Sequence, residues 1–542
     1  MASVPPASPP DPATIPWWSD RRYVIALVLA CAVPLIMPKL PPFTDLLGHL
    51  ARYHVQLTID TSPWLHRYFG FHWQLVGNLG VDLLVIPLSK LFGLQFAVKL
   101  IVLSIPPMTA AGLLWIAREC HGGRIPPTAA FALPLAYGFP FQFGFVNSCL
   151  AMAFCFLAFG LWLYLGRKER WALRGAIFVP LGAIIWLMHS YGWGVLGLLA
   201  FSAELVRDRG HGGSRLHAIW RSALSTWPLW PPILLMLMWR SGSVSGNTFD
   251  WFNWIAKWAY LIAALRERWK GFDVGSLDLV LILVLAAVVR LRLQFEKTLG
   301  IAAIILAAAY LLLPRVLLGS AYADMRLVPY ALAIAVIGIR PRDEGNRTLS
   351  TALAIAACLF FVVRMGASTW SLWQYDKEYD KQLVALDHVR PGSAVMVLVN
   401  LTCEGTWSKS RMDHLGSQAI VRRDAFANGQ WTMPGAQLLT VTYAAAGRFA
   451  RDPTQLLRPP TCRRRGEPIY EDTLKYFPRR AYDYFWLIDM PRERWPHEPD
   501  LIPVWEGERG VLYRIDASKQ IDPPTFVPPL DPPRYGPRRV RD

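Results

Sequence analysis

The sequence predicts an α-helical polytopic membrane protein with a small α/β domain at its carboxyl end. Apolar residues make up 53% of the 542-residue chain, the mean hydropathy is +0.27, and there are 24 tryptophans. Apolar runs of about 20 residues, the length needed to cross a bilayer core, recur over residues 23–366. A polar, proline-punctuated stretch follows, so the chain has two parts.

The amino-terminal segment predicts no membrane span of its own. Residues 1–16 are rich in Pro, Ala and Ser and lack the charge, apolar core and small-residue cleavage site of a signal peptide. Arg21 and Arg22 precede the first apolar run and favour the cytoplasmic side. We therefore expect residues 1–22 to form a disordered cytoplasmic tail.

Basic residues between the apolar runs predict how many spans there are. Residues 76–92 are apolar but short, and they carry Asp82 and Lys90. If this segment crossed the membrane, Arg118 and Arg124 would face outward, against the positive-inside rule. We therefore expect it to lie along the outer surface or to insert only partly.

With that choice the sequence predicts about eleven spans, an amino terminus inside and a carboxyl-terminal domain outside. The spans are 23–40, 96–117, 127–145, 147–166, 174–190, 191–206, 223–239, 276–290, 298–313, 327–339 and 349–366. The later basic clusters then all lie inside: Arg167, Lys168 and Arg170; Arg207, Arg209 and Arg215; Arg290, Arg292 and Lys297; Arg340, Arg342 and Arg347.

The first outer loop, residues 41–92, begins with three functional side chains on one predicted helical face. Asp45, His49 and Arg52 are spaced four and three residues apart. An acid, an imidazole and a guanidinium at a bilayer surface suit acid/base chemistry or the binding of a lipid phosphate. Alternatively, Asp45 caps the helix, His49 positions a neighbour, and Arg52 anchors its helix to lipid headgroups.

Further polar residues are predicted on the same membrane face. His189 and Tyr191 lie at a span end, and Asp324 and Arg326 lie in a late outer loop, residues 314–326. We expect these four residues to bind substrate. Alternatively, His189 and Tyr191 are interfacial anchors, and Asp324 and Arg326 form a surface ion pair.

Residues 367–520 predict the outer α/β domain. Strand-like runs occur at 394–399, 484–488 and 511–515, with a helix-like stretch over 435–449. Residues 521–542 are Pro-rich and are expected to be a disordered tail. Cys403 and Cys462 are the only cysteines of this domain, so in an oxidising compartment they could form its one disulfide.

Composition and motifs exclude several function classes. The net charge of +17 comes from residues between apolar runs, which does not indicate nucleic-acid binding. There is no GxxxxGK[ST] phosphate loop, no GxSxG nucleophile elbow, and no CxxC or HExxH zinc spacing. Any chemistry must therefore be built at the membrane surface.

The chain resembles the GT-C superfamily of polytopic glycosyltransferases, which use a sugar linked to a polyprenyl phosphate. The resemblance rests on the topology, on the acid in the segment PPFTD at 41–45, and on outer-surface helices before the second span. It also rests on the outer carboxyl-terminal domain and on the segment YADMRLVP at 322–329, where an arginine stands at membrane re-entry.

The resemblance implies an inverting transfer in which Asp45 acts as general base on an acceptor hydroxyl. Arg326 would bind the departing lipid phosphate, since a guanidinium holds two phosphate oxygens at once. Many members carry paired acids in the first loop, whereas this chain has one acid there, with Asp60 and Asp82 as unmatched candidates for a second. We expect no obligatory cofactor, although a divalent metal stays possible.

The sequence therefore favours a glycosyltransferase of a bacterial-type inner membrane. Its partners would be a polyprenyl-phosphate sugar donor, a lipid, glycan or protein acceptor, and membrane lipids. A transporter or lipid flippase is the first alternative, but the predicted spans hold almost no ionisable residues and show no clear repeat. A non-catalytic envelope assembly protein is the second.

Overall fold

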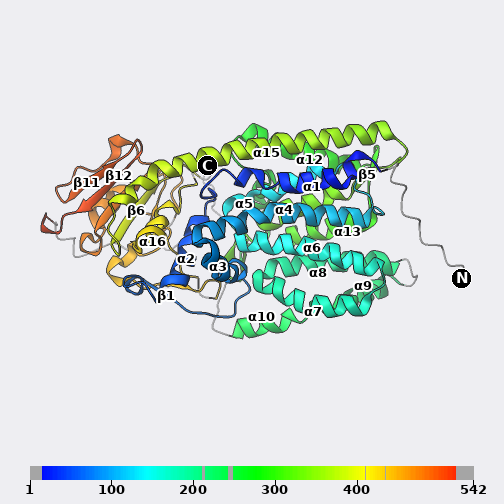
Figure 1. Ribbon diagram of the computed structural model, residues 1–542, viewed down its shortest axis with the longest axis horizontal. Coiled ribbons are helices and arrows are strands. Elements are labelled where there is room, and N and C mark those ends of the chain that lie inside the picture. Colours follow the sequence, from blue (N-terminus) through cyan, green and yellow to red (C-terminus); the bar gives the residue numbers. More distant parts are fainter. Residues whose placement is uncertain are drawn as a thin grey trace, which may run out of the picture.

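The computed structural model describes residues 15–209, 214–241, 248–403, 405–408, 411–433, 435–464 and 466–519. Helices dominate these residues, and they form an elongated bundle with a sheet domain at one end (Figure 1). Residues 1–14 and 520–542, which hold most of both predicted tails, lie outside the described residues.

Residues 15–22 of the predicted tail of residues 1–22 are described, and they include helical structure, which corrects that part of the prediction. Trp17–Ser19 forms a 3-10 turn, and helix α1 (Arg21–Ala30) follows. Asp20 caps α1, because its carboxylate accepts a hydrogen bond from the Arg22 backbone N–H at 2.8 Å.

Five helices of the described chain are long and apolar enough to cross a membrane. They confirm the helices predicted near 96–117, 147–166, 174–190, 276–290 and 349–366. Three more predicted segments are also helical, whereas the number of crossings stays a prediction. The long helices are α4 (Leu94–Cys120), α6 (Val146–Arg167), α7 (Trp171–Met188), α12 (Lys270–Val288) and α15 (Arg347–Leu383). The other three are α8 (Ser190–Arg209), α13 (Lys297–Leu312) and α14 (Val328–Ile337).

Three segments predicted as continuous spans are divided instead, and each of them contains proline, which interrupts helical hydrogen bonding. Residues 23–40, 127–145 and 223–239 are therefore not single helices. In chain order the pieces are α1 with the 3-10 turn Val33–Leu35, the 3-10 helix Ala129–Tyr137 with α5 (Phe139–Phe143), and α9 (Arg215–Ser225) with α10 (Pro232–Ser241).

The three glycines of the segment Gly192 to Gly197 have the GxGxxG spacing of a dinucleotide-binding turn. Here the segment lies inside α8, after another helix rather than after a strand. A Cβ on Gly192 would lie 2.7 Å from the Ala151 Cβ, so this glycine serves the packing of α8 on α6.

Helix α15 connects the bundle with the carboxyl-terminal domain and runs past the predicted domain boundary at residue 366. Its 37 residues correspond to roughly 55 Å of helix. In its second half, the Asp376 carboxylate accepts hydrogen bonds from the backbone N–H groups of Lys39 (3.1 Å) and Leu40 (3.2 Å). The helix thereby holds the start of the first outer loop.

The carboxyl-terminal domain is built on a mixed sheet with the strand order β11-β12-β10-β6-β7, and β9 also pairs with β6. Strand β10 pairs with β6 in parallel and with β12 antiparallel, and every residue of β10 is buried. The predicted strands over 394–399, 484–488 and 511–515 are confirmed. The strands are β6 (Ala394–Asn400), β7 (Phe426–Ala427), β9 (Leu456–Leu457), β10 (Tyr484–Ile488), β11 (Leu501–Glu506) and β12 (Gly510–Ile515).

The helix predicted over 435–449 is wrong. Strand β8 (Leu439–Val441) and the 3-10 turn Ala444–Phe449 occupy these residues. Strand β8 pairs antiparallel with β1 (Phe69–Phe71) of the first outer loop. A pairing partner some 370 residues away outweighs the local helical pattern.

The first outer loop lies between the bundle and the sheet domain (Figure 1). It contains α2 (Leu46–Thr58) and α3 (Gly80–Phe92). His54 of α2 lies 2.6 Å from the Asp424 carboxylate of the sheet domain. This end of the bundle is opposite the end that holds β5 (Ile339–Pro341) and α9.

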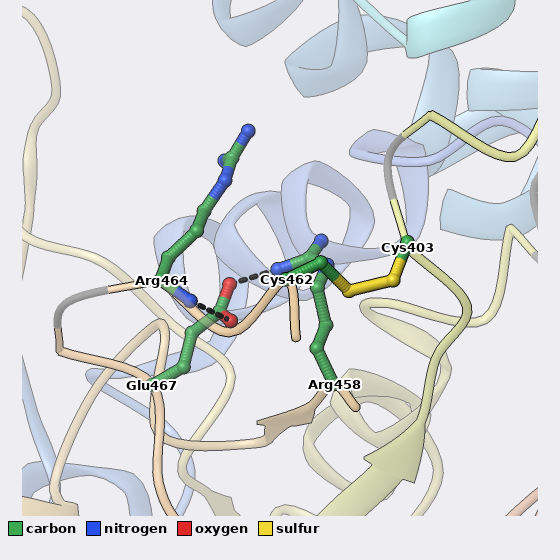
Figure 2. Close-up of a disulfide and its surroundings, with 5 residues drawn as sticks. All are labelled: Cys403, Arg458, Cys462, Arg464 and Glu467. Carbon is green, nitrogen blue, oxygen red and sulfur yellow. Dashed lines mark hydrogen bonds and ion pairs between the residues drawn. A yellow bond between two sulfur atoms is a disulfide. The ribbon is translucent and has the colours of Figure 1, made fainter. Parts of the chain in front are cut away.

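The predicted disulfide between Cys403 and Cys462 is confirmed, with a Cα–Cα distance of 5.6 Å (Figure 2). Beside it, the Glu467 carboxylate pairs with the Arg458 guanidinium and accepts a 2.8 Å hydrogen bond from the Arg464 backbone N–H. The disulfide closes a segment of the sheet domain that reaches the candidate site described next.

Candidate functional site

Asp45 lies at the start of α2, where the outer loop meets the bundle. Its backbone N–H donates to the Phe143 carbonyl at 2.9 Å, and its side chain makes no capping hydrogen bond to α2. Gly144 packs directly against it with a φ of +103°, and a Cβ there would lie 3.0 Å from the Asp45 nitrogen. The carboxylate is 19% exposed, so it is sheltered but accessible.

His414 of the sheet domain faces Asp45. Its Nε2 lies 3.7 Å from the Asp45 Oδ1, and its Nδ1 lies 3.0 Å from the Gly429 carbonyl oxygen. The His414 side chain is buried, and its ring packs on Trp431 with centroids 4.8 Å apart. The sequence analysis did not single out His414, because 369 residues separate it from Asp45.

Arg326 is a buried cation without a carboxylate partner in the part of the chain that the structure describes. Its Nη2 donates to the Ser320 Oγ and the Ala321 carbonyl, both at 3.2 Å. Its guanidinium lies 4.2 Å from the centre of the Phe145 ring. It also interacts electrostatically with the Asp45 carboxylate, so the structure brings together the predicted acid and the predicted phosphate-binding arginine.

His189 lies beside Arg326, and both nitrogens of the His189 ring lie within hydrogen-bond distance of an N–H donor. The Nδ1 lies 3.1 Å from the Tyr191 backbone nitrogen, and the Nε2 lies 3.1 Å from the Arg326 Nη1. A neutral imidazole has one acceptor nitrogen, so it cannot accept both hydrogen bonds. If Nδ1 accepts the hydrogen bond from Tyr191, Nε2 carries the proton. The N–H groups of the His189 Nε2 and the Arg326 Nη1 then face each other 3.1 Å apart. An anion bound by both groups would stabilise this arrangement.

Several polar atoms near Arg326 are buried without a hydrogen-bond partner among the described residues. They are the Arg326 Nε, the Tyr191 hydroxyl and the His49 Nδ1. Burial, followed by the nearby Arg52 guanidinium, holds the pKa of His49 well below its usual value of 6.5. His49 is therefore a neutral imidazole, which fits a positioning role better than a charged one.

Arg52 is committed to a structural ion pair. Its guanidinium binds the Asp82 carboxylate of α3, with Nη2 3.2 Å from Oδ2. Asn147 of α6 donates to the same carboxylate at 3.2 Å, and both charged groups are buried. The structure thus gives Arg52 and Asp82 a structural role, while substrate binding by Arg52 stays a prediction.

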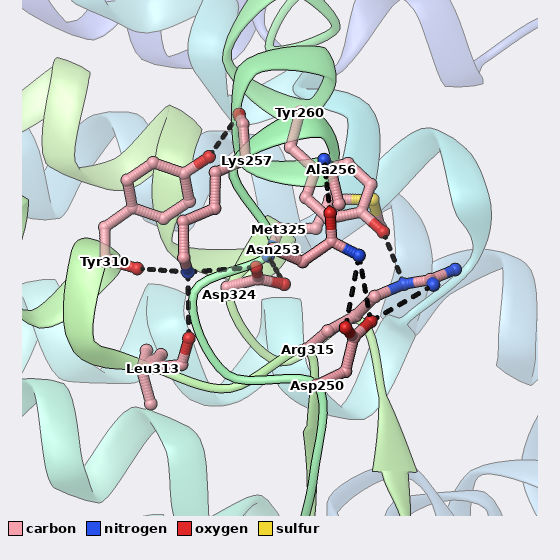
Figure 3. Close-up of polar contacts among 10 residues, drawn as sticks. All are labelled: Asp250, Asn253, Ala256, Lys257, Tyr260, Tyr310, Leu313, Arg315, Asp324 and Met325. Atoms are coloured by element: carbon pink, nitrogen blue, oxygen red, sulfur yellow. Dashed lines mark hydrogen bonds and ion pairs between the residues drawn. The ribbon is translucent and has the colours of Figure 1, made fainter. Parts of the chain in front are cut away.

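Asp324 also serves the architecture rather than the site (Figure 3). Its carboxylate lies 3.2 Å from the Lys257 Nζ and accepts from the Met325 backbone N–H at 2.9 Å. Lys257 also donates to the carbonyls of Tyr310 and Leu313, each at 2.8 Å. The predicted surface pair of Asp324 with Arg326 is therefore wrong. Asp324 pairs with Lys257 instead, and Lys257 joins α11 (Trp254–Ile262) to the end of α13.

Arg411 is another buried cation near the site, and the sequence does not predict it. Its Nη1 donates to the Pro42 carbonyl at 3.0 Å and to the Gln142 Oε1 at 2.8 Å. Pro42 belongs to the PPFTD segment, so the sheet domain holds the segment that carries Asp45. No sequence signal marks Arg411, since its partners are distant in the chain.

An apolar groove of about 850 Å³ lies between helices of the bundle. Its walls come mainly from α8, α12, α13 and α14. On α13 it extends from Lys297 to Tyr310, which is roughly 20 Å of helix. Val328, which follows Arg326 by two residues in the chain, is among the residues that line it.

Within the described ranges, no three His, Cys, Asp or Glu side chains gather where they could hold a metal ion. The two acids that the sequence offers as a second acid of the site, Asp82 and Asp60, do not join it. Asp82 pairs with Arg52, and Asp60 lies 92% exposed near His66.

The chain is similar to a few solved structures, and only at low sequence identity. No protein-family model matches the chain, and no curated protein matches it. Among solved structures, the chain is similar to ArnT from Cupriavidus metallidurans bound to undecaprenyl phosphate, with 13% identity and a TM-score of 0.46. The similarity to the apo state of ArnT has the same identity and a TM-score of 0.48. Each alignment covers 92% of this chain and 98% of the other, and at this identity and TM-score the likeness assigns neither activity nor ligand.

Proposed function

We propose that this chain is a multi-pass membrane glycosyltransferase that moves a sugar from a polyprenyl-phosphate carrier to an acceptor hydroxyl. The observation that carries the proposal is an accessible carboxylate, Asp45, in electrostatic range of a buried guanidinium, Arg326, that forms no ion pair among the described residues. An apolar groove whose lining includes Val328, two residues after Arg326, supports a donor that has both an anionic head and a long apolar tail.

The chemistry is a single displacement with inversion at the anomeric carbon. Asp45 removes the proton from the acceptor hydroxyl while the oxygen attacks that carbon. The bond from the carbon to the phosphate oxygen breaks, and the leaving polyprenyl phosphate takes the electron pair. Arg326, with the His189 imidazole beside it, stabilises the charge that develops on this phosphate.

The location belongs to the same proposal. Helix α2, at whose start Asp45 stands, and the sheet domain lie at one end of the bundle, and β5 and α9, which carry residues of the predicted inner basic clusters, lie at the other end (Figure 1). We assign the site to the outer face of a bacterial-type inner membrane. The acceptor would be a lipid, a glycan under construction or a protein.

A transfer assay tests the proposal. Purified full-length protein is incubated with a labelled polyprenyl-phosphate sugar and a cell-envelope extract, with and without EDTA. We expect label in an acceptor fraction, an equal amount of free carrier phosphate, and the same rate with EDTA. Movement of intact donor between the leaflets of a vesicle, without phosphate release, would instead identify a transporter. If the protein shows neither transfer nor transport, the result would favour an assembly protein.

A further inference from the structure

The contact between Asp45 and His414 has a definite proton arrangement. The Gly429 carbonyl, 3.0 Å from the His414 Nδ1, can only accept a hydrogen bond, so Nδ1 carries a proton. In neutral His414 the Nε2 is then a lone pair directed at the Asp45 carboxylate, 3.7 Å away. Two proton acceptors that face each other repel, and a proton added between them relieves the repulsion.

The packing around His414 keeps this arrangement in place. Trp431 contacts the His414 ring on one side and Gly48 of α2 on the other. A Cβ on Gly48 would lie 2.5 Å from the Trp431 ring, so only glycine allows this approach. Gln430 secures the same segment, because its Nε2 donates to the Gly48 carbonyl at 3.2 Å.

The other charged groups around His414 do not occupy its Nε2. Asp452 interacts with His414 electrostatically, and burial raises its pKa, while its carboxylate accepts from the Gln455 Nε2 at 2.7 Å. His49 of α2 is held neutral, as described above. Asp413 precedes His414 in the chain and interacts electrostatically with Asp452 and Arg458.

We propose that His414 accepts the proton that Asp45 takes up during transfer. The proton leaves the acceptor hydroxyl for Asp45 and passes to the His414 Nε2, which becomes an imidazolium hydrogen-bonded to Asp45 and Gly429. It then leaves to solvent after the polyprenyl phosphate departs. The inference rests on the proposed function, and it makes His414 a positioning residue that acts through Asp45.

The role predicts a change in the pH profile, which a purely structural role would not produce. His414 accepts the proton at Nε2 in this role, so the transfer rate of the wild type depends on an Nε2 that is free to accept it. His414→Asn keeps a donor to Gly429 but cannot take up the proton. We expect it to lower kcat about 10- to 100-fold at neutral pH and to move the acid limb to lower pH.

The experiment compares full-length wild type, His414→Asn, His414→Gln and Asp45→Asn, with His388→Asn as the control at an exposed histidine of the same domain. Loss of transfer in the wild type would end the proposed function, whereas an unmoved acid limb in both active His414 variants would overturn only this inference. If those variants fail to fold, ¹⁵N NMR of histidine-labelled wild type decides. Neutral His414 must carry its proton on Nδ1, and a proton on Nε2 would overturn the proposal.

Discussion

At the scale of single residues, the site depends on which charged groups are already paired. Of the three predicted residues at the start of the first outer loop, Arg52 is bound by Asp82, whereas Asp45 remains accessible. Of the late-loop pair, Asp324 is bound by Lys257, and Arg326 contacts only neutral groups among the described residues. Arg326, which forms no ion pair among the described residues, is therefore the cation suited to a charged substrate.

Arg326 should bind the donor phosphate with two hydrogen bonds, which lysine cannot reproduce with the same geometry. We expect Arg326→Lys to weaken binding of polyprenyl phosphate about 10- to 100-fold, since a charge-assisted hydrogen bond contributes about 1.5–3 kcal/mol. Competition of unlabelled polyprenyl phosphate against the labelled donor measures this. The exposed Arg342, changed to lysine, is the control, and equal affinity of both variants would exclude Arg326 from phosphate binding.

His49 should make stability pH-dependent. Its pKa is depressed in the folded state, so its contribution is fully present above about pH 6.5 and is lost as the pH falls from there toward the folded-state pKa. The expected loss is about 1.4 kcal/mol per pH unit in that window. The unfolding midpoint, followed between pH 7.5 and 5, should fall more in wild type than in His49→Gln. Parallel curves for the two proteins would contradict the assignment.

At the scale of elements, the segment between Cys403 and Cys462 joins the sheet domain to the site. It carries Arg411, which holds the Pro42 carbonyl, and His414 and Trp431, which pack at the start of α2. The disulfide at its base therefore supports residues that touch the site from outside the bundle (Figure 2).

Replacing both cysteines by serine should lower the unfolding midpoint of the sheet domain. A disulfide that closes a loop of this length, with a sequence separation of 59 residues, contributes about 4 kcal/mol in the chain-entropy estimate. We expect transfer activity to fall together with the midpoint, because the loop holds Arg411 and His414. Scanning calorimetry and the transfer assay measure both, with Cys120→Ser as control. An unchanged midpoint and rate would show that the segment is held without the bond.

The elements also show what the sequence could predict. Long apolar helices such as α4 and α6 follow from local hydropathy, and β6 and β10 follow from local apolar runs. Strand β8 does not, because its pairing partner β1 lies in another part of the chain. Hydropathy predicts residues 23–40, 127–145 and 223–239 as single spans, because it averages over the points where each helix is interrupted.

At the scale of the whole molecule, the bundle, the first outer loop and the sheet domain meet at one place. Sequence reasoning identified Asp45 and Arg326, since their types and positions carry chemical meaning by themselves. It could not identify His414, Arg411 or the Asp82 partner of Arg52, because these roles arise only from contacts between distant segments. The apolar groove likewise requires several helices to assemble.

The central claim is that Asp45 takes the acceptor proton while Arg326 holds the donor. The most direct test is single-turnover transfer by the full-length protein, with donor binding measured in the same samples. We predict that Asp45→Asn binds the donor with unchanged affinity and transfers its sugar about 10²- to 10⁴-fold more slowly, whereas Asp60→Asn, an exposed acid of the same loop, behaves like wild type. Transfer by Asp45→Asn at the wild-type rate would contradict the claim.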